Sequence, residues 1–308
     1  SVAGIDANFR FGFLSVNGWV ARSSSPAAIQ SRPGNPYASN IGYQYTSRKW
    51  NFQTDYKSVG GAFNDEMGFI QRYGVSNLDA RWGRIYRPKL LSKWMRQNMP
   101  HLEMDIFTRH SDGSLDSRYM GWHWNVNFQD GSNAEIGYNT SEENILTPFV
   151  INATRGVRVQ PGHYEFGEAF AFWNTNSSAR LSFNNRFGVG DYYDGYRRNF
   201  QFGPSVRLNE NFNASLSLQF NDISLSTGDF LTKLLTTRVN YNFNTKMFAN
   251  ALVQYNTDNR QWTSNVRFNI IHRPLSDIFI VYNEKRDDRT GLMLSRAVIA
   301  KMTYMVAF

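Results

Sequence analysis

The stretch FNASLSLQFN, residues 212–221, decides the fold class of this chain. Its apolar residues occupy every second position, and its polar residues occupy the positions between them. Alternate side chains of a β-strand point to opposite faces, whereas a helix would scatter the same residues around its circumference. The stretch therefore predicts a strand with one apolar face and one polar face.

The same alternation recurs along most of the chain. It is clear at residues 5–11, 122–129, 199–208, 238–243, 247–256 and 262–270. Short polar turns, such as residues 130–132 and 209–211, alternate with longer links near residues 24–37, 60–77, 142–162 and 284–293. Short turns on one side and long loops on the other are typical of outer-membrane β-barrels. The pattern predicts about 16–18 antiparallel strands.

The chain ends on AKMTYMVAF, residues 300–308, in which every second residue from Ala300 to Phe308 is apolar or aromatic. Outer-membrane barrels finish on such a strand, because an open sheet edge within lipid would leave backbone groups unpaired. We expect Tyr304, Val306 and Phe308 to be the assembly signal that the barrel-assembly machinery recognises. Taken alone, this tail fits an amphipathic strand of a soluble protein equally well.

Composition also favours a barrel. The 308 residues are 41% hydrophobic, mean hydropathy is -0.50, and no stretch approaches the ~18 apolar residues of a membrane-spanning helix. A search for long apolar stretches does not detect a β-barrel, because alternate residues of each barrel strand face a wet interior and are polar. Aromatic residues reach 16%, which suits lipid-facing surfaces and interfacial girdles. A soluble propeller would show a repeat of ~40–50 residues, and the sequence shows none.

These features predict an all-β protein, a transmembrane antiparallel up-and-down β-barrel that is integral to the outer membrane of a Gram-negative bacterium and forms a single domain over residues 1–308. The strand count falls near an odd number, whereas single-chain bacterial barrels have even numbers. The chain also begins at Ser1 without a signal peptide. We therefore expect an N-terminally incomplete barrel, the C-terminal part of a larger one. Residues 87–101 fit either another strand or a short interfacial helix.

Several segments resemble one protein family. They are VAGIDA (residues 2–7), GAFNDEMGFIQR (residues 61–72), ALVQYN (residues 251–256), HRP (residues 272–274) and FIVYNE (residues 279–284). Together they resemble an uncharacterised family of Bacteroidetes-type envelope proteins, which join a carbohydrate-binding-module-family-nine-like domain to a long C-terminal outer-membrane barrel. The resemblance implies that this chain is the barrel part. Some members carry a membrane-associated hydrolase label, but the N-terminal module is absent here, so no glycan-binding residue is carried over.

Alternation assigns side chains to two faces. We expect the lumen-lining face to carry Arg10, Arg180, Arg186, Arg197, Arg207, Arg238, Arg267, Lys301, Asp55, Asp105 and Glu135. The expected lipid-facing and girdle residues are Trp50, Trp122, Trp124, Phe212, Phe220, Tyr241, Trp262, Tyr304 and Phe308. Glu168 falls on the same face as its aromatic neighbours at residues 164–172, where a charge within lipid is expensive. Basic residues outnumber acidic ones in the lumen-lining set, so an aqueous path would prefer anions. The alternative is a network of ion pairs that braces a plugged interior.

The sequence carries no recognisable catalytic motif. It contains no HExxH, GxSxG, P-loop or Rossmann glycine pattern. Its five histidines, at positions 101, 110, 123, 163 and 272, are too scattered for metal-ligand spacing. We expect no enzymatic activity, no cofactor and no bound metal. The net charge is +8 without a run of five Lys or Arg residues, so nucleic acid is not an expected partner.

The sequence thus predicts a porin-like pore or translocation channel with a mildly basic lumen, which a plug, a partner or the missing N-terminal region could occupy. The alternative is a structural or anchoring barrel within a larger envelope assembly, without transport activity. The expected partners are outer-membrane lipid, lipopolysaccharide and other envelope proteins.

Overall fold

The computed structural model describes residues 1–26, 32–65 and 68–305. The strands of these residues form one antiparallel sheet of 17 strands and a separate hairpin, β9 (Phe149–Asn152) with β10 (Val157–Val159). One 3-10 turn, η1 (Lys89–Leu91), is the only helical segment within the described residues. The all-β, antiparallel class is confirmed, and closure of the sheet into a barrel stays a prediction.

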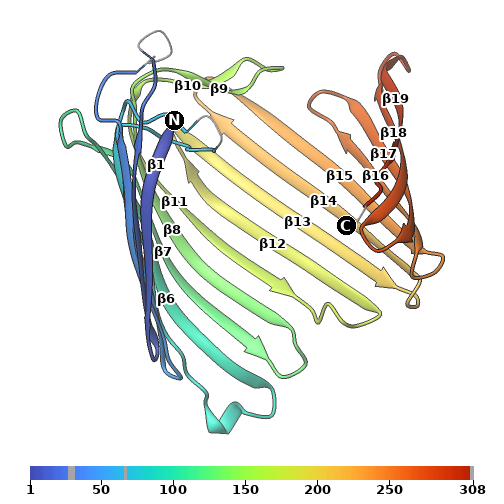
Figure 1. Cartoon of the computed structure of the whole chain (residues 1–308), viewed down its shortest axis with the longest axis horizontal. Helices are drawn as coiled ribbons and strands as arrows, with labels where there is room; N and C mark the ends of the chain where they lie inside the picture. Colours follow the sequence, from blue (N-terminus) through green and yellow to red (C-terminus); the bar gives the residue numbers. More distant parts are fainter. Residues whose placement is uncertain (27–31, 66–67, 306–308) are drawn as a thin grey trace. The chain divides into compact units, whose positions relative to one another are not determined.

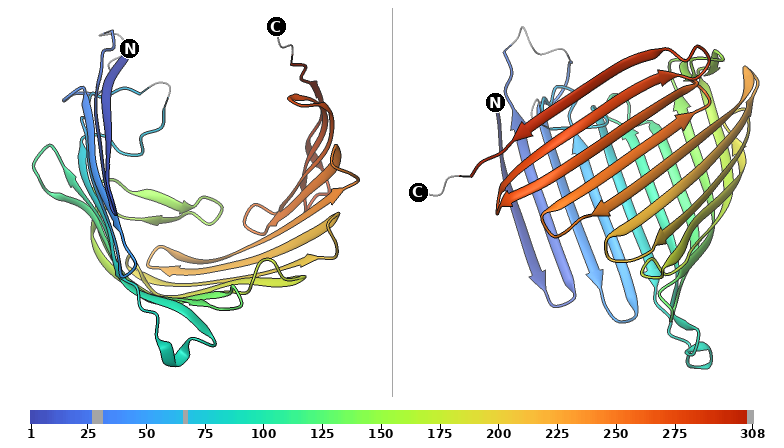
Figure 2. Two further views of the ribbon diagram at one scale, coloured as in Figure 1. Left: turned by 60° about the horizontal axis from the view of Figure 1, so that its bottom comes forward. Right: turned by 90° about the vertical axis from the view of Figure 1, so that its right-hand side faces the viewer.

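The chain divides into two compact units. The first comprises Ser1–Gln129, Glu135–Phe149 and Val159–Ala169, and the second comprises Asp130–Ala134, Val150–Arg158 and Phe170–Phe308. Each unit is an array of long strands that follow the order of the sequence (Figures 1 and 2).

In the first unit, each strand from β1 to β7 pairs antiparallel with the next. Five of them, β1 to β5, are 10 residues long, and β6 and β7 are 15 and 14 residues long. The strands are β1 (Val2–Phe11), β2 (Leu14–Ser23), β3 (Tyr37–Thr46), β4 (Trp50–Val59), β5 (Val75–Arg84), β6 (Met95–Arg109), β7 (Leu115–Phe128), β8 (Asn133–Ile145) and β11 (Gly162–Asn174), of which β8 and β11 extend into the second unit.

In the second unit, each strand from β12 to β18 likewise pairs antiparallel with the next. These strands are β12 (Leu181–Tyr192), β13 (Gly195–Arg207), β14 (Phe212–Leu225), β15 (Gly228–Asn242), β16 (Met247–Asn256), β17 (Gln261–Arg273), β18 (Ser276–Asp287) and β19 (Met293–Met302). The stretch that predicts the fold class, residues 212–221, lies within β14 as expected.

Local side-chain bonds close the tight turns. Asp112 accepts hydrogen bonds from the backbone N–H of Ser114 at 3.0 Å and from its hydroxyl at 2.7 Å. Asp130 does the same with Ser132, at 2.8 and 2.6 Å. Because these bonds favour the ionised carboxylate, they hold the pKa of both aspartates below its usual range. Such Asx turns reverse the chain with few residues, which explains why the predicted turn at 130–132 joins two strands.

The ambiguous segment at residues 87–101 contains a three-residue 3-10 turn rather than a longer helix, followed by a strand. It begins with the 3-10 turn η1, in which the Ser92 N–H donates to the carbonyl of Lys89 at 3.3 Å, and it then enters β6 at Met95. The predicted link at residues 142–162 is shorter than expected, because β8 continues to Ile145 and the hairpin β9–β10 fills the centre of the link.

Gly60 closes β4 where the backbone of the β2–β3 link passes very near. Its N–H donates to the carbonyl of Tyr37 at 2.8 Å, and a Cβ at this position would lie 1.9 Å from the carbonyl oxygen of Asn35. We therefore expect Gly60→Ala to destabilise the first unit by about 1–3 kcal/mol. Urea unfolding followed by tryptophan fluorescence measures this. Ser111→Ala, in an exposed turn, is the control and should change stability by less than about 0.5 kcal/mol.

Candidate functional site

The register of the first unit assigns each charged side chain to a face. Directly paired residues of an antiparallel sheet share a face. Asp55 pairs with Asp79, and Asp79 pairs with Asp105, so three carboxylates cross β4, β5 and β6 in one row. The next row on the same face runs from Arg10 on β1 to Arg81 on β5. Three predicted lumen-lining residues, Arg10, Asp55 and Asp105, therefore lie on one polar face.

The second unit carries a basic polar face. The register places six predicted lumen-lining residues together, namely Arg186, Arg197, Arg207, Arg238, Arg267 and Lys301. Aromatic rings accompany several of them, because a guanidinium is attracted to a ring face. The Arg197 guanidinium lies 4.4 Å from the ring centroid of Tyr192. Arg180 lies outside the strands, in the turn before β12, so strand alternation does not assign it to this face.

The opposite face of each unit is mainly apolar and exposed, and charged side chains on it, such as the ion-paired Glu284, Arg286 and Arg296, lie near strand ends. It carries the predicted lipid-facing residues Trp50, Trp122 and Trp124 in the first unit, and Phe212, Phe220, Tyr241 and Trp262 in the second. Large side chains stand free on this face: Ile41 is 61% exposed and Trp122 is 50% exposed. Exposed apolar side chains that gather on one face are common on surfaces that contact a membrane or another protein.

The predicted C-terminal strand ends earlier than expected. β19 stops at Met302, and Tyr304 lies beyond it, with the Arg273 guanidinium 3.9 Å from its ring centroid. Val306 and Phe308, the other two residues of the expected assembly signal, lie outside the described residues.

The expected orientation of β11 is wrong. Its odd-numbered residue Trp173 is 52% exposed, whereas Glu168 and Phe170 are 9% and 6% exposed. The Arg186 guanidinium, on the polar face, lies 4.6 Å from the Phe170 ring centroid. The even-numbered side chains of β11 therefore point to the polar face, and Glu168 places no charge on the apolar face. Alternation assigned the aromatic residues of β11 to the lipid-facing side, whereas they lie on the polar side of the strand.

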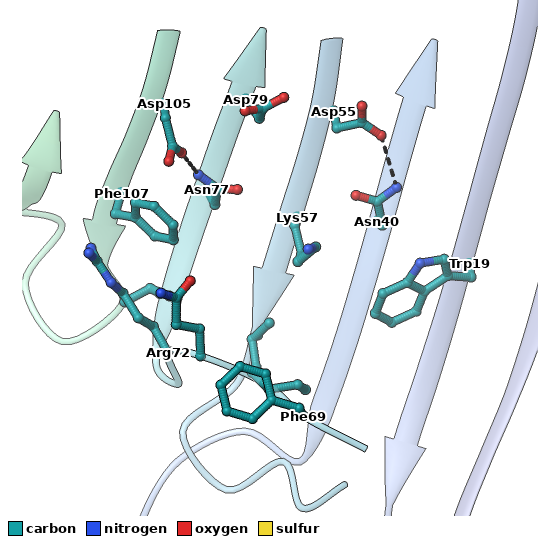
Figure 3. A pocket seen from close by; sticks show the side chains of 14 residues that line it. Trp19, Asn40, Asp55, Lys57, Phe69, Arg72, Asn77, Asp79, Asp105 and Phe107 are labelled. Atoms are coloured by element: carbon teal, nitrogen blue, oxygen red, sulfur yellow. Dashed lines mark hydrogen bonds between the residues drawn. The ribbon is translucent and has the colours of Figure 1, made fainter. Parts of the chain in front are cut away.

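A cavity of 700 Å³ opens on the polar face of the first unit (Figure 3). Its walls combine aromatic rings, such as Trp19 and Phe107, with the aspartate row and Lys57. Amide side chains hold two of the carboxylates: Asn40 donates to Asp55 at 3.5 Å, and Asn77 donates to Asp105. The cavity thus offers hydrogen-bond acceptors, one amine and flat apolar surfaces to a solute.

The link between β4 and β5 folds back over this face and forms one wall of the cavity. Phe63 is buried against Ala38 and Val59. Further along the link, the Arg72 guanidinium donates to Asp116 at 3.0 Å and to the Ser117 hydroxyl at 2.6 Å, and it lies 4.2 Å from the centroid of the Phe107 ring. An apolar contact and a charged contact therefore fix the link at its two ends.

Two histidines meet beside the aspartate row. His101 on β6 pairs directly with His123 on β7, and their ring centroids are 5.1 Å apart. Glu103 lies on the same face of β6, and Glu135, a predicted lumen-lining residue, reaches the pair from β8. The His101 side chain is completely buried, and those of His123 and Glu135 are 5% and 10% exposed. A second group, Glu142, His163 and Glu165, is more open to solvent.

Sequence spacing did not reveal the histidine pair. His101 and His123 are too far apart along the chain to show metal-ligand spacing, yet the fold brings their ring centroids within 5.1 Å of each other. The signal that finds them is the hairpin register: with the β6–β7 turn centred near residue 112, positions 101 and 123 fall opposite each other.

Among the described residues, no helix is long and apolar enough to cross a membrane. No protein-family model, curated protein or solved structure matches this chain, so the family resemblance drawn from its sequence motifs stays an expectation.

Proposed function

We propose that the chain is an integral outer-membrane β-barrel protein whose sheet turns its apolar face to lipid and its polar face to an aqueous passage for solutes. The observation that carries the proposal is the separation of the two faces: exposed aromatic and aliphatic side chains predominate on one, and charged or amide side chains predominate on the other. A membrane wall has this arrangement, because each strand meets hydrocarbon on one side and water on the other.

The aromatic residues of the first unit are ordered in a way that suits a bilayer boundary. On the apolar face, the register aligns Tyr45 with Phe52, Phe52 with Trp82, and Trp82 with Leu102, which pairs with Trp122. This row crosses β3 to β7. In β3 and β4 it lies near the strand ends that the short turn at residues 47–49 connects. The Tyr45 and Phe52 rings stack at 6.3 Å. Aromatic girdles of this kind lie at the headgroup level of outer-membrane barrels.

Strand length fits the thickness of a bilayer. The strands β1 to β5 are each 10 residues long, and a tilted transmembrane strand needs ~9–11 residues. Longer strands, such as β6 with 15 residues, would extend beyond the hydrocarbon into the aqueous phase.

The basic face of the second unit predicts the ionic preference of the passage. In planar bilayers, we expect the wild-type chain to conduct with a preference for anions, because fixed positive charge along a pore raises the local anion concentration. Replacing Arg238 and Arg267 together by glutamate should shift the reversal potential in a salt gradient toward cations.

The matched control replaces Arg48 and Lys246, both in turns, by glutamate. This control changes the net charge by the same amount as the Arg238 and Arg267 replacement, and it should shift the reversal potential much less than that replacement does. Inserted protein that does not conduct, and that instead co-purifies with other envelope proteins at fixed stoichiometry, would contradict the channel and favour the anchoring barrel.

A further inference from the structure

The buried histidine pair holds its two rings in defined tautomers. His101 Nδ1 lies 3.0 Å from the carbonyl oxygen of Met99, which can only accept, so this nitrogen carries the hydrogen. Arg81 Nη2, which can only donate, lies 3.0 Å from His101 Nε2. The lone pair of His101 Nε2 therefore points into the cluster formed by His101, His123, Glu103 and Glu135.

His123 is oriented in the complementary way. Its Nε2 lies 2.8 Å from the amide oxygen of Asn139 and donates to it. Its Nδ1 then faces Glu135 Oε1 at 3.3 Å and Glu103 Oε2 at 3.7 Å. Because an imidazole lone pair and a carboxylate are both acceptors, this approach requires positive charge between them, either a proton or a metal ion.

Two separations between donor atoms match a metal site. Metal–ligand bonds of about 2.0–2.1 Å in a tetrahedron place neighbouring ligand atoms about 3.3–3.4 Å apart. His123 Nδ1 and Glu135 Oε1 are 3.3 Å apart, and His101 Nε2 and Glu103 Oε1 are 3.4 Å apart. The ligand atoms of His101, His123 and Glu135 all lie within 4.8 Å of one another.

The surroundings of these ligands are also those of a metal centre. Metal-bound histidines usually donate their other N–H to a carbonyl or carboxylate, as Met99 and Asn139 allow here. Asn125 donates to Glu135 at 3.0 Å and so orients this carboxylate. A cavity of 290 Å³ on the polar face is lined in part by Arg81 and Glu103 and so borders the cluster.

We propose that His101, His123, Glu103 and Glu135 bind one divalent transition-metal ion, of which Zn²⁺ fits the mixed nitrogen and oxygen ligands well. The ion joins β6, β7 and β8 on the polar face. Arg81 is its competitor, because the Arg81 guanidinium lies beside His101 and its Nε is 3.2 Å from Glu103 Oε1. With a side chain that is 43% exposed, Arg81 is free to turn outward when the ion binds.

The test is metal binding by the purified chain of residues 1–308 in detergent micelles after treatment with a chelator. We expect one Zn²⁺ per chain by calorimetry, and Co²⁺ should give the visible absorption bands of a four-coordinate site. His123→Gln and Glu135→Gln should each weaken Zn²⁺ binding by at least about 10–100-fold. Arg81→Gln should tighten it, because a competing positive charge is removed.

His163→Gln is the matched control, since this histidine belongs to the other, more exposed cluster. It should leave Zn²⁺ affinity unchanged. The proposal is overturned if the wild-type chain binds no Zn²⁺, which would leave a proton at the cluster, or if His163→Gln abolishes binding while Glu135→Gln does not. If His123→Gln does not fold, the other two variants still test the proposal, because they change no buried ring. Zn²⁺ affinity should fall in Glu135→Gln and rise in Arg81→Gln.

Discussion

Ile41→Arg is expected to prevent stable insertion into a bilayer, at a cost of about 2–4 kcal/mol. Ile41 lies near the middle of β3 on the apolar face, and its register partners Gly18 and Tyr56 place it away from the charged rows. The arginine would have to enter hydrocarbon unpaired, far from either headgroup layer. Urea-dependent folding into lipid vesicles, followed by tryptophan fluorescence, measures the change in free energy.

The neighbouring position supplies a matched control. Asn40→Arg introduces the same charge at the same depth but on the polar face, and it should cost much less. The two substitutions separate a membrane wall from a soluble sheet, because a residue that is 61% exposed to water tolerates arginine within about 0.5 kcal/mol. If Ile41→Arg folds as readily as the wild type and remains dispersed without detergent or lipid, the membrane assignment is wrong.

Asp116→Ala is expected to release the β4–β5 link from the polar face and to destabilise the first unit by about 2–3 kcal/mol. Asp116 accepts ion pairs from Arg72 at 3.0 Å and from Arg109 at 2.7 Å, and the Arg109 side chain is only 16% exposed. Without the carboxylate, two guanidinium groups lose a charged partner that they share. The link that walls the 700 Å³ cavity should then open locally more often.

Limited trypsin digestion in micelles tests this opening. Cleavage after Arg72, identified by mass spectrometry, should become faster in Asp116→Ala, while cleavage elsewhere stays unchanged. The control is Asp222→Ala, whose ion pair with Arg198 spans 3.7 Å between side chains that are 64% and 50% exposed. An exposed pair of this kind contributes roughly 0–1 kcal/mol. Equal digestion of both variants and the wild type would show that Asp116 does not hold the link.

The sequence predicted strands best where each residue type suits only one of the two faces, apolar or polar. Along residues 212–221, apolar and polar groups alternate without error, so β14 and its two faces follow directly from the period of a strand. β11 misled because Phe170 packs under Arg186 on the polar side. An aromatic ring serves equally well against lipid or against a guanidinium, and alternation alone does not tell which surface it meets.

The sequence by itself determined the all-β class, the antiparallel connections and most of the division between polar and apolar faces, because these depend on local period and turn chemistry. Only the tertiary structure decided which distant residues meet: His101 with His123, and Asp116 with Arg72 and Arg109. Such meetings depend on hairpin register and on how a long link folds back. One residue of slip would turn His123 to the other face, and no local pattern fixes that register.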